Sequence, residues 1–241
     1  MWHIVEGEAG CQFAIENKLV AVIVDALRAS ATAASLLEAG ATAVWAVREI
    51  EDALEAEKVW PDALLYGERG GLPPVGFDFG NSPREADAAL GRRVIFTTTT
   101  GAGRLVQSRG AAAVYMGSTV NGGALVRAVS REGRGAVIIP AGLMTDPSFP
   151  AQEDWVAAVS LARASGETIG EGSALYETWC ERIRDEGVPA LFESAPHSEK
   201  LRTVGLESDI AFCAQSDIYG AVPRVADWNE LGGILLNARE K

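Results

Sequence analysis

Short apolar runs alternate with alanine-rich helical patterns over the first 140 residues, and this alternation constrains the fold more than any other feature of the sequence. The runs expected to form strands are Leu19–Ala26, Ala43–Val47, Ala63–Tyr66, Arg93–Thr97, Ala112–Met116 and Gly135–Pro140. The helices expected between them are Ser30–Ala39, Glu49–Trp60, Pro83–Leu90, a segment opening near Thr100–Gly101, and Asn121–Arg131. Since parallel strands need helical crossovers, the pattern predicts an α/β fold with three layers, α/β/α, around a largely parallel, mixed sheet.

From about residue 151 the pattern becomes more helical. The expected helices are Gln152–Ala164, Gly172–Asp185, Val188–Ser194 and His197–Val204, and strand-like runs follow at Asp209–Cys213 and Ala221–Val225. The segment Met144–Pro150, with two prolines, is the best internal boundary, but it reads equally well as a loop. The sequence therefore predicts one domain over residues 1–241.

Composition limits the function. The net charge of −12 disfavours nucleic-acid binding, and an anionic substrate would need local arginines or a divalent metal to offset the repulsion. No apolar stretch reaches the ~18 residues of a membrane span, and no signal-peptide pattern is present, so a cytoplasmic protein is expected. Three scattered cysteines and two histidines disfavour structural zinc. The oligomeric state stays open, with a homo-oligomer among the possibilities.

Polar groups follow five of the expected strands, and ligands of parallel sheets bind beyond the carboxyl ends of the strands. These groups are Asp25, Arg28 and Ser30; Glu68, Arg69 and Asp78; Thr98, Thr99, Thr100 and Gly101; Asn121; and Glu153 with Asp154. The loop Tyr66–Pro83 carries more charge and glycine than a connector needs. We expect the five strand ends to share one rim that holds a metal and an anion.

Each of these groups also has a simpler explanation. Asp25 and Glu153-Asp154 could be carboxylates that a helix dipole favours, and Asn121 could be only a cap. Ser82 and Pro83 fit a helix start, which leaves Asn81 for the site. Four consecutive threonines before Gly101 exceed what one cap needs, so this turn is expected to bind a phosphate or sulfonate. It is not a Walker A loop.

Three segments together resemble the 2-phosphosulfolactate phosphatase family: Val22–Ser30, Gly67–Gly71 and Gly76–Pro83. Further matches are the threonine-rich strand end, Asn121, Ala141-Gly142, Glu153-Asp154 and the tail Gly205–Ala214, so the resemblance covers nearly the whole chain. It implies an Mg²⁺-dependent enzyme with an α/β/α architecture. Such an enzyme removes phosphate from 2-phospho-3-sulfolactate, a step toward coenzyme M.

The resemblance also implies roles for single residues. Asp25, Glu68 and Asp78 would be catalytic and would bind metal together with Glu153 and Asp154. Anion binding would fall to Arg28, Ser30, Arg69, Asn81, Thr98, Thr99, Thr100, Gly101 and Asn121. The chain departs from the family where Thr98–Ala102 replaces the usual Thr-Thr-Asn-Gly-Thr/Ser, and lost hydrogen bonds at this turn would redirect specificity.

The sequence thus predicts a magnesium-dependent phosphatase for a small, multiply anionic phosphate ester. No Asp-x-Asp pair is present, since Leu27 follows Asp25 at the second position, and no well-placed Cys-x5-Arg occurs. Direct attack by water is therefore favoured over a covalent intermediate. Two alternatives stay open: a non-catalytic binder of a small acid or nucleotide, and a nucleotide-dependent enzyme, which the missing Walker and Gly-x-Gly-x-x-Gly motifs disfavour.

Overall fold

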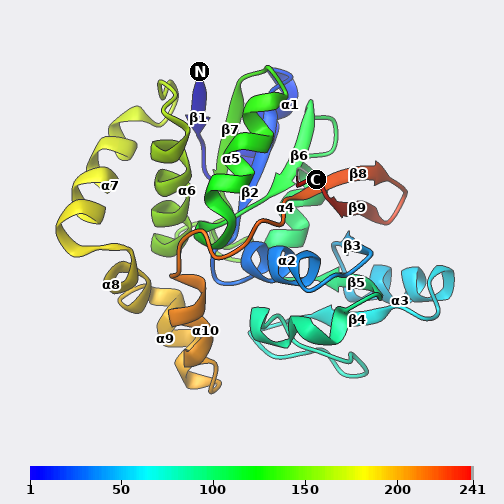
Figure 1. Cartoon of the computed structure of the whole chain (residues 1–241). Helices are drawn as coiled ribbons and strands as arrows, with labels where there is room; N and C mark the ends of the chain where they lie inside the picture. The colour runs from blue at the N-terminus through cyan, green and yellow to red at the C-terminus, as the bar shows by residue number, and fades with distance from the viewer. Residues whose placement is uncertain (240–241) are drawn as a thin grey trace.

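The computed structural model describes residues 1–239, which form an α/β fold around one mixed sheet (Figure 1). Within these residues nine strands lie in the order β1-β7-β2-β6-β8-β9-β3-β5-β4. Their bounds are β1 Trp2–Ile4, β2 Val20–Val24, β3 Ala43–Val47, β4 Leu64–Gly67, β5 Arg93–Thr97, β6 Ala113–Met116, β7 Ala136–Pro140, β8 Pro223–Trp228 and β9 Gly232–Asn237. The predicted three-layer fold with a largely parallel, mixed sheet is confirmed.

The helices cover both faces of this sheet. They are α1 Gly7–Glu16, α2 Ala29–Glu38, α3 Ile50–Val59, α4 Gly101–Gln107, α5 Gly122–Arg131, α6 Gln152–Ser165, α7 Ser173–Glu186, α8 Val188–Glu193, α9 Pro196–Thr203 and α10 Glu207–Cys213, with short 3-10 helices η1 Pro83–Ala89 and η2 Thr119–Asn121. Local chemistry sets several ends: a capping box of Glu49 and Asp52 begins α3, and left-handed Gly166 ends α6. Ser82 caps the helix that begins at Pro83, as predicted, but this helix is a 3-10 helix rather than an α-helix.

The sheet consists of two parallel groups that a hairpin joins. Strands β1, β7, β2 and β6 pair in parallel, as do β3, β5 and β4. The hairpin β8–β9 lies between the groups and pairs antiparallel with β6 on one side and with β3 on the other. Three successive antiparallel steps reverse the direction of the second group relative to the first.

The twist of the sheet brings the two groups face to face. Ala21 and Ile23 of β2 share a hydrophobic core with Val44 of β3 and Phe96 of β5, although four steps of the sheet separate β2 from β3 and five separate it from β5. In Figure 1 the strands of the two groups run in clearly different directions. Because twist accumulates from strand to strand, the carboxyl ends of both groups reach the same region of the molecule.

Both faces of the central strands are buried, which explains their continuous apolar sequences. The opposite face of β2, made by Val20, Val22 and Val24, packs in a second core with residues of α5 and α6. A third, smaller core lies between β3, β5 and α3. Strands that are covered on both sides lose the apolar–polar alternation of a half-exposed strand.

The structure corrects the expected elements in two places. The run Asp209–Cys213, expected as a strand, belongs to helix α10, where Asp209, Ile210 and Cys213 are buried at helical spacing. Strand β1, helix α1 and strand β9 were not predicted. No helix within residues 1–239 has both the length and the apolar character to span a bilayer.

Candidate functional site

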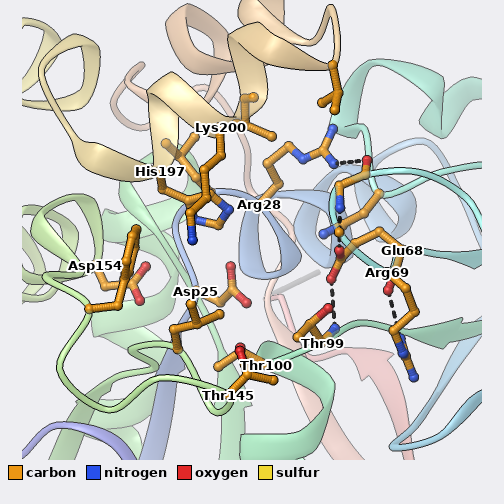
Figure 2. Close-up of a pocket in the computed structure, with 18 of the residues that line it drawn as sticks. Asp25, Arg28, Glu68, Arg69, Thr99, Thr100, Thr145, Asp154, His197 and Lys200 are labelled. Atoms are coloured by element: carbon orange, nitrogen blue, oxygen red, sulfur yellow. Dashed lines mark hydrogen bonds between the residues drawn. The ribbon is translucent and has the colours of Figure 1, made fainter.

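A cavity of about 490 Å³ lies where the carboxyl ends of β2, β4, β5 and β7 meet helix α9 (Figure 2). This volume suits a small-molecule ligand. Polar residues that line it are Asp25, Arg28, Glu68, Arg69, Asn81, Thr99, Thr100, Thr145, Asp154, His197, Lys200 and Thr203. Both parallel groups of the sheet therefore contribute to one cavity; four of the five strand ends expected at the rim line it, and the end of β6 does not.

Asp25 directly follows β2 and is only 9% exposed. Its Oδ1 accepts a hydrogen bond from the Ala29 N–H at 3.1 Å. Burial raises the pKa of the Asp25 carboxyl to about 6, and neighbouring carboxylates, including Glu68, add to this rise while His197 opposes it. A strongly perturbed carboxyl in a cavity is typical of a functional group.

Gly101 at the start of α4 allows close approach to this carboxyl. A Cβ at position 101 would lie 2.7 Å from the Asp25 Oδ2 and 2.5 Å from the Ala29 Cβ. Any side chain there would displace Asp25 or the start of α2. Glycine at this position therefore has a packing reason.

The first turn of α6 supplies two more buried carboxylates. Asp154 accepts hydrogen bonds from the backbone N–H groups of Ala26 at 2.7 Å and Gly142 at 3.1 Å, and so joins the ends of β2 and β7. Burial, with the charges of Glu153 and Asp25, raises the pKa of Asp154 well above its ordinary value. Glu153 is 1% exposed, and its Oε2 has no hydrogen-bond partner within the described chain.

His197 and Lys200 enter the cavity from α9, opposite Asp25 and Thr100 (Figure 2). The His197 Nδ1 lies 3.1 Å from the Glu153 Oε1. Burial opposes the charged imidazole, but Glu153, followed by Asp25 and Glu68, outweighs this effect and raises the pKa of His197. The sequence prediction missed both residues. The only available signal for His197 was the scarcity of histidine, which occurs twice in the chain.

Arg28 lines the cavity but is already held by the protein. It is 3% exposed, and its Nη1 forms a 2.6 Å ion pair with the Asp209 Oδ2, while its Nη2 donates to the Gly71 carbonyl at 3.0 Å. Ser82 donates to the other oxygen of Asp209 at 2.8 Å. These contacts fasten the loop after β4 and helix α10 to the start of α2.

Glu68 and Arg69 organise the same wall. The Glu68 Oε1 accepts from the Thr99 N–H at 2.7 Å, and the Oε2 accepts from the Gly71 N–H at 2.9 Å. Arg69 donates to the Glu68 carbonyl at 2.7 Å and to the Thr97 hydroxyl at 3.1 Å. Both side chains thus fix the loop against β5.

The threonine turn has fewer free backbone N–H groups for an anion than expected, because side chains already accept hydrogen bonds from two of them. Glu68 binds the Thr99 N–H, and the Thr98 hydroxyl binds the Ala102 N–H at 3.0 Å. The Thr100 hydroxyl accepts from the Met144 N–H at 3.3 Å. Two buried polar atoms at the cavity, Thr99 Oγ1 and Asn81 Oδ1, have no hydrogen-bond partner within residues 1–239.

Six residues expected in the site do not line the cavity: Thr98, Gly101 and Glu153, whose surroundings are given above, and Asp78, Asn121 and Ser30. Asp78 is exposed and accepts from the Leu65 N–H at 2.8 Å, so it anchors the loop to β4. Asn121 accepts from the Ser118 N–H at 3.0 Å and donates to the Ala221 carbonyl at 2.9 Å. Ser30 donates to the Ile23 carbonyl and accepts from the Asp25 N–H, each at 3.0 Å. Their contacts are those of structural residues.

The five carboxylates expected to bind metal are not gathered into one set. Within residues 1–239, no three Asp, Glu, His or Cys side chains are placed to share a metal ion. Backbone N–H groups occupy both oxygens of Glu68 and of Asp154, and Asp78 lies elsewhere. Asp25 Oδ2 is the carboxylate oxygen that faces Gly101 and the threonine turn.

Comparisons with known proteins agree with this picture. The sequence profile of the 2-phosphosulpholactate phosphatase family matches residues 8–227. A probable 2-phosphosulfolactate phosphatase of Gloeobacter violaceus is 35% identical over 213 residues, which cover 85% of this chain and 87% of the relative. A protein of the same description from Deinococcus radiodurans is 35% identical, with 88% of this chain and 90% of the relative covered. Another, from Carboxydothermus hydrogenoformans, is 33% identical, with 86% of each covered. The chain belongs to the 2-phosphosulfolactate phosphatase family.

Proposed function

We propose that this protein hydrolyses a small, multiply anionic phosphate monoester, with 2-phospho-3-sulfolactate as the substrate and 3-sulfolactate and phosphate as the products. Family membership supports the reaction class, and the names of the relatives support the substrate. The observation that carries the proposal is Asp25, a buried carboxyl with a pKa raised to about 6 in a cavity of suitable size.

We propose Mg²⁺ as the cofactor, and the donor chemistry fits it. Mg²⁺ prefers oxygen ligands and is commonly held by one or two carboxylates together with substrate phosphate and water. Asp25 would hold the ion through Oδ2, the oxygen that faces Gly101 and the threonine turn. The ion would neutralise phosphoryl oxygens and favour ionisation of a water molecule.

The remaining groups of the cavity have complementary roles. The Thr99 hydroxyl, buried and without a partner within the described chain, is available to donate to a phosphoryl oxygen. His197, held by Glu153 and with a raised pKa, is the group placed to give a proton to the departing alkoxide. Arg28 and Glu68 keep the walls of the cavity in position.

A phosphate-release screen with the purified chain tests the proposal. The panel contains 2-phospho-3-sulfolactate, 2-phospholactate and p-nitrophenyl phosphate, each with Mg²⁺ and with EDTA. We expect release that needs Mg²⁺, is fastest with 2-phospho-3-sulfolactate and is lost in Asp25→Asn. Asp78→Asn, which alters a carboxylate outside the cavity, is the control and should keep its activity. If no ester is hydrolysed and Asp25→Asn alters only ligand binding, the protein is instead a non-catalytic binder.

A further inference from the structure

The basic side chains that line the cavity differ in whether they are free to bind a ligand. Carboxylates of Asp25, Asp154 and Glu68 line it, in a protein of net charge −12. 2-Phospho-3-sulfolactate carries a carboxylate and a sulfonate besides its phosphate, and these groups, which are not transferred, need a positive charge because the protein otherwise repels them. The lysine and arginine residues that line the cavity are Arg28, Arg69 and Lys200.

The two arginines are committed to other partners. The charge of Arg28 is balanced by Asp209, and each side chain of this pair is 2% exposed. The guanidinium of Arg69 donates to the Glu68 and Arg48 carbonyls and to the Thr97 hydroxyl, and Figure 2 shows it directed away from Asp25. Recruiting either arginine to a ligand would break contacts that fix the loop after β4.

Lys200 differs from both arginines. It lies on α9 at the mouth of the cavity, is exposed, and forms no salt bridge with any carboxylate of residues 1–239. Its Nζ lies 3.9 Å from the centre of the Phe149 ring. A cation over an aromatic face is held weakly and keeps its charge for another partner. The ring also meets His197 edge-on, at 6.1 Å between centroids, so Phe149 supports both His197 and Lys200.

We propose that Lys200, resting on Phe149, forms the subsite for the second anionic group of the substrate, a sulfonate or carboxylate. This assignment rests on the proposed function, because it places the phosphoryl group at the opposite wall, beside Asp25 and Thr99. The ammonium of lysine is a compact, strongly hydrated charge on a flexible stem, so it can leave the ring and follow a ligand that enters the cavity. Selection for an anionic group besides the phosphate then depends on α9, and the altered threonine turn is not needed for it.

The test compares substrates that differ in the second anion. Lys200→Met keeps the length of the side chain and removes its charge. We expect kcat/KM for 2-phospho-3-sulfolactate and 2-phospholactate to fall about 10- to 100-fold, as the loss of a charge-assisted hydrogen bond predicts, mainly through KM. For p-nitrophenyl phosphate, which has no second anion, kcat/KM should change less than about twofold. Lys200→Arg should restore most of the selectivity.

The matched control is Lys58→Met, which removes the same charge from an exposed lysine paired with Glu55 on α3. It should leave both classes of substrate unaffected. An equal loss on all esters in Lys200→Met would overturn the inference, because Lys200 would then contact the transferred phosphoryl group. Unchanged kinetics on every substrate would overturn it as well.

Calorimetric titration with 3-sulfolactate separates this inference from the proposed function. Binding by the unaltered protein that weakens at least about tenfold in Lys200→Met supports the subsite, even if no ester is hydrolysed. Equal affinity in both proteins, or no binding by either, refutes the subsite. A protein that binds 3-sulfolactate through Lys200 but releases no phosphate would refute the proposed hydrolysis alone.

Discussion

Replacing Asp25 by asparagine should stabilise the metal-free protein while abolishing its activity. The pKa of this carboxyl rises from an ordinary 3.8 to about 6 in the folded state, chiefly through burial. Each pKa unit corresponds to 1.36 kcal/mol, so the ionised carboxylate costs the fold about 3 kcal/mol. Asparagine keeps the oxygen that accepts from the Ala29 N–H and carries no charge. The variant should therefore gain up to about 3 kcal/mol.

The sign of the pH dependence follows from the raised pKa. Below pH 3.8 the carboxyl is neutral in the folded and unfolded states, so it costs nothing. Between pH 3.8 and about 6 the unfolded chain ionises first, and stability falls as the pH rises. Above about pH 6 the full cost remains. The advantage of Asp25→Asn should thus be small near pH 4 and largest near pH 8.

Urea unfolding of the unaltered protein and of Asp25→Asn in EDTA at these two pH values measures the effect. Adding Mg²⁺ should stabilise the unaltered protein more than Asp25→Asn, because a bound cation offsets the repulsion among Asp25, Glu153 and Asp154. The reasoning is refuted if Asp25→Asn is less stable than the unaltered protein near pH 8, or if the difference is the same at both pH values.

Three further substitutions test the rest of the site. Asp209→Asn should lower the free energy of unfolding, measured by urea denaturation, by about 3–5 kcal/mol, because it leaves the buried Arg28 charge uncompensated. A decrease below about 1 kcal/mol would contradict this. Gly101→Ala should lower the stability by about 1–3 kcal/mol and should also lower kcat, because the added methyl group clashes with Ala29 and Asp25. An unchanged kcat would show that Asp25 can move without loss of activity. His197→Gln should lower kcat about 10²- to 10⁴-fold for alkyl phosphates but much less for p-nitrophenyl phosphate, whose leaving group needs no proton; equal losses would exclude a role as proton donor.

The sequence predicted the strands whose two faces are both buried, such as β2 and β3, because burial leaves continuous apolar runs. It missed β9, which begins with Gly232 and Gly233 and so resembles a turn. A Cβ at position 232 would lie 2.1 Å from the Ala46 carbonyl, so pairing with β3 requires glycine there. A long-range constraint of this kind leaves no pattern in the local sequence.

The site was predictable to the extent that strand ends determine it. Asp25 and Thr99 follow their strands directly and do reach the cavity. Asp78 and Asn121 also follow strands along the chain, but their side chains bind the backbone N–H groups of Leu65 and Ser118, and sequence position does not reveal where a side chain points. His197 was missed because it comes from α9, far along the chain, and only the folded structure brings it to β2.

The position of the β8–β9 hairpin has a consequence for how the protein reaches its active form. The last strands of the chain fill the centre of the sheet, so β6 and β3 each have an unpaired edge until the hairpin has been synthesised. Until both strands of the hairpin have been synthesised the two halves of the sheet are not joined, and exposed strand edges promote aggregation. Since Asp25 belongs to one half and Glu68 and Thr99 to the other, we expect the cavity to form only after the hairpin has paired with β6 and β3, and a chain truncated before Pro223 to be insoluble and inactive.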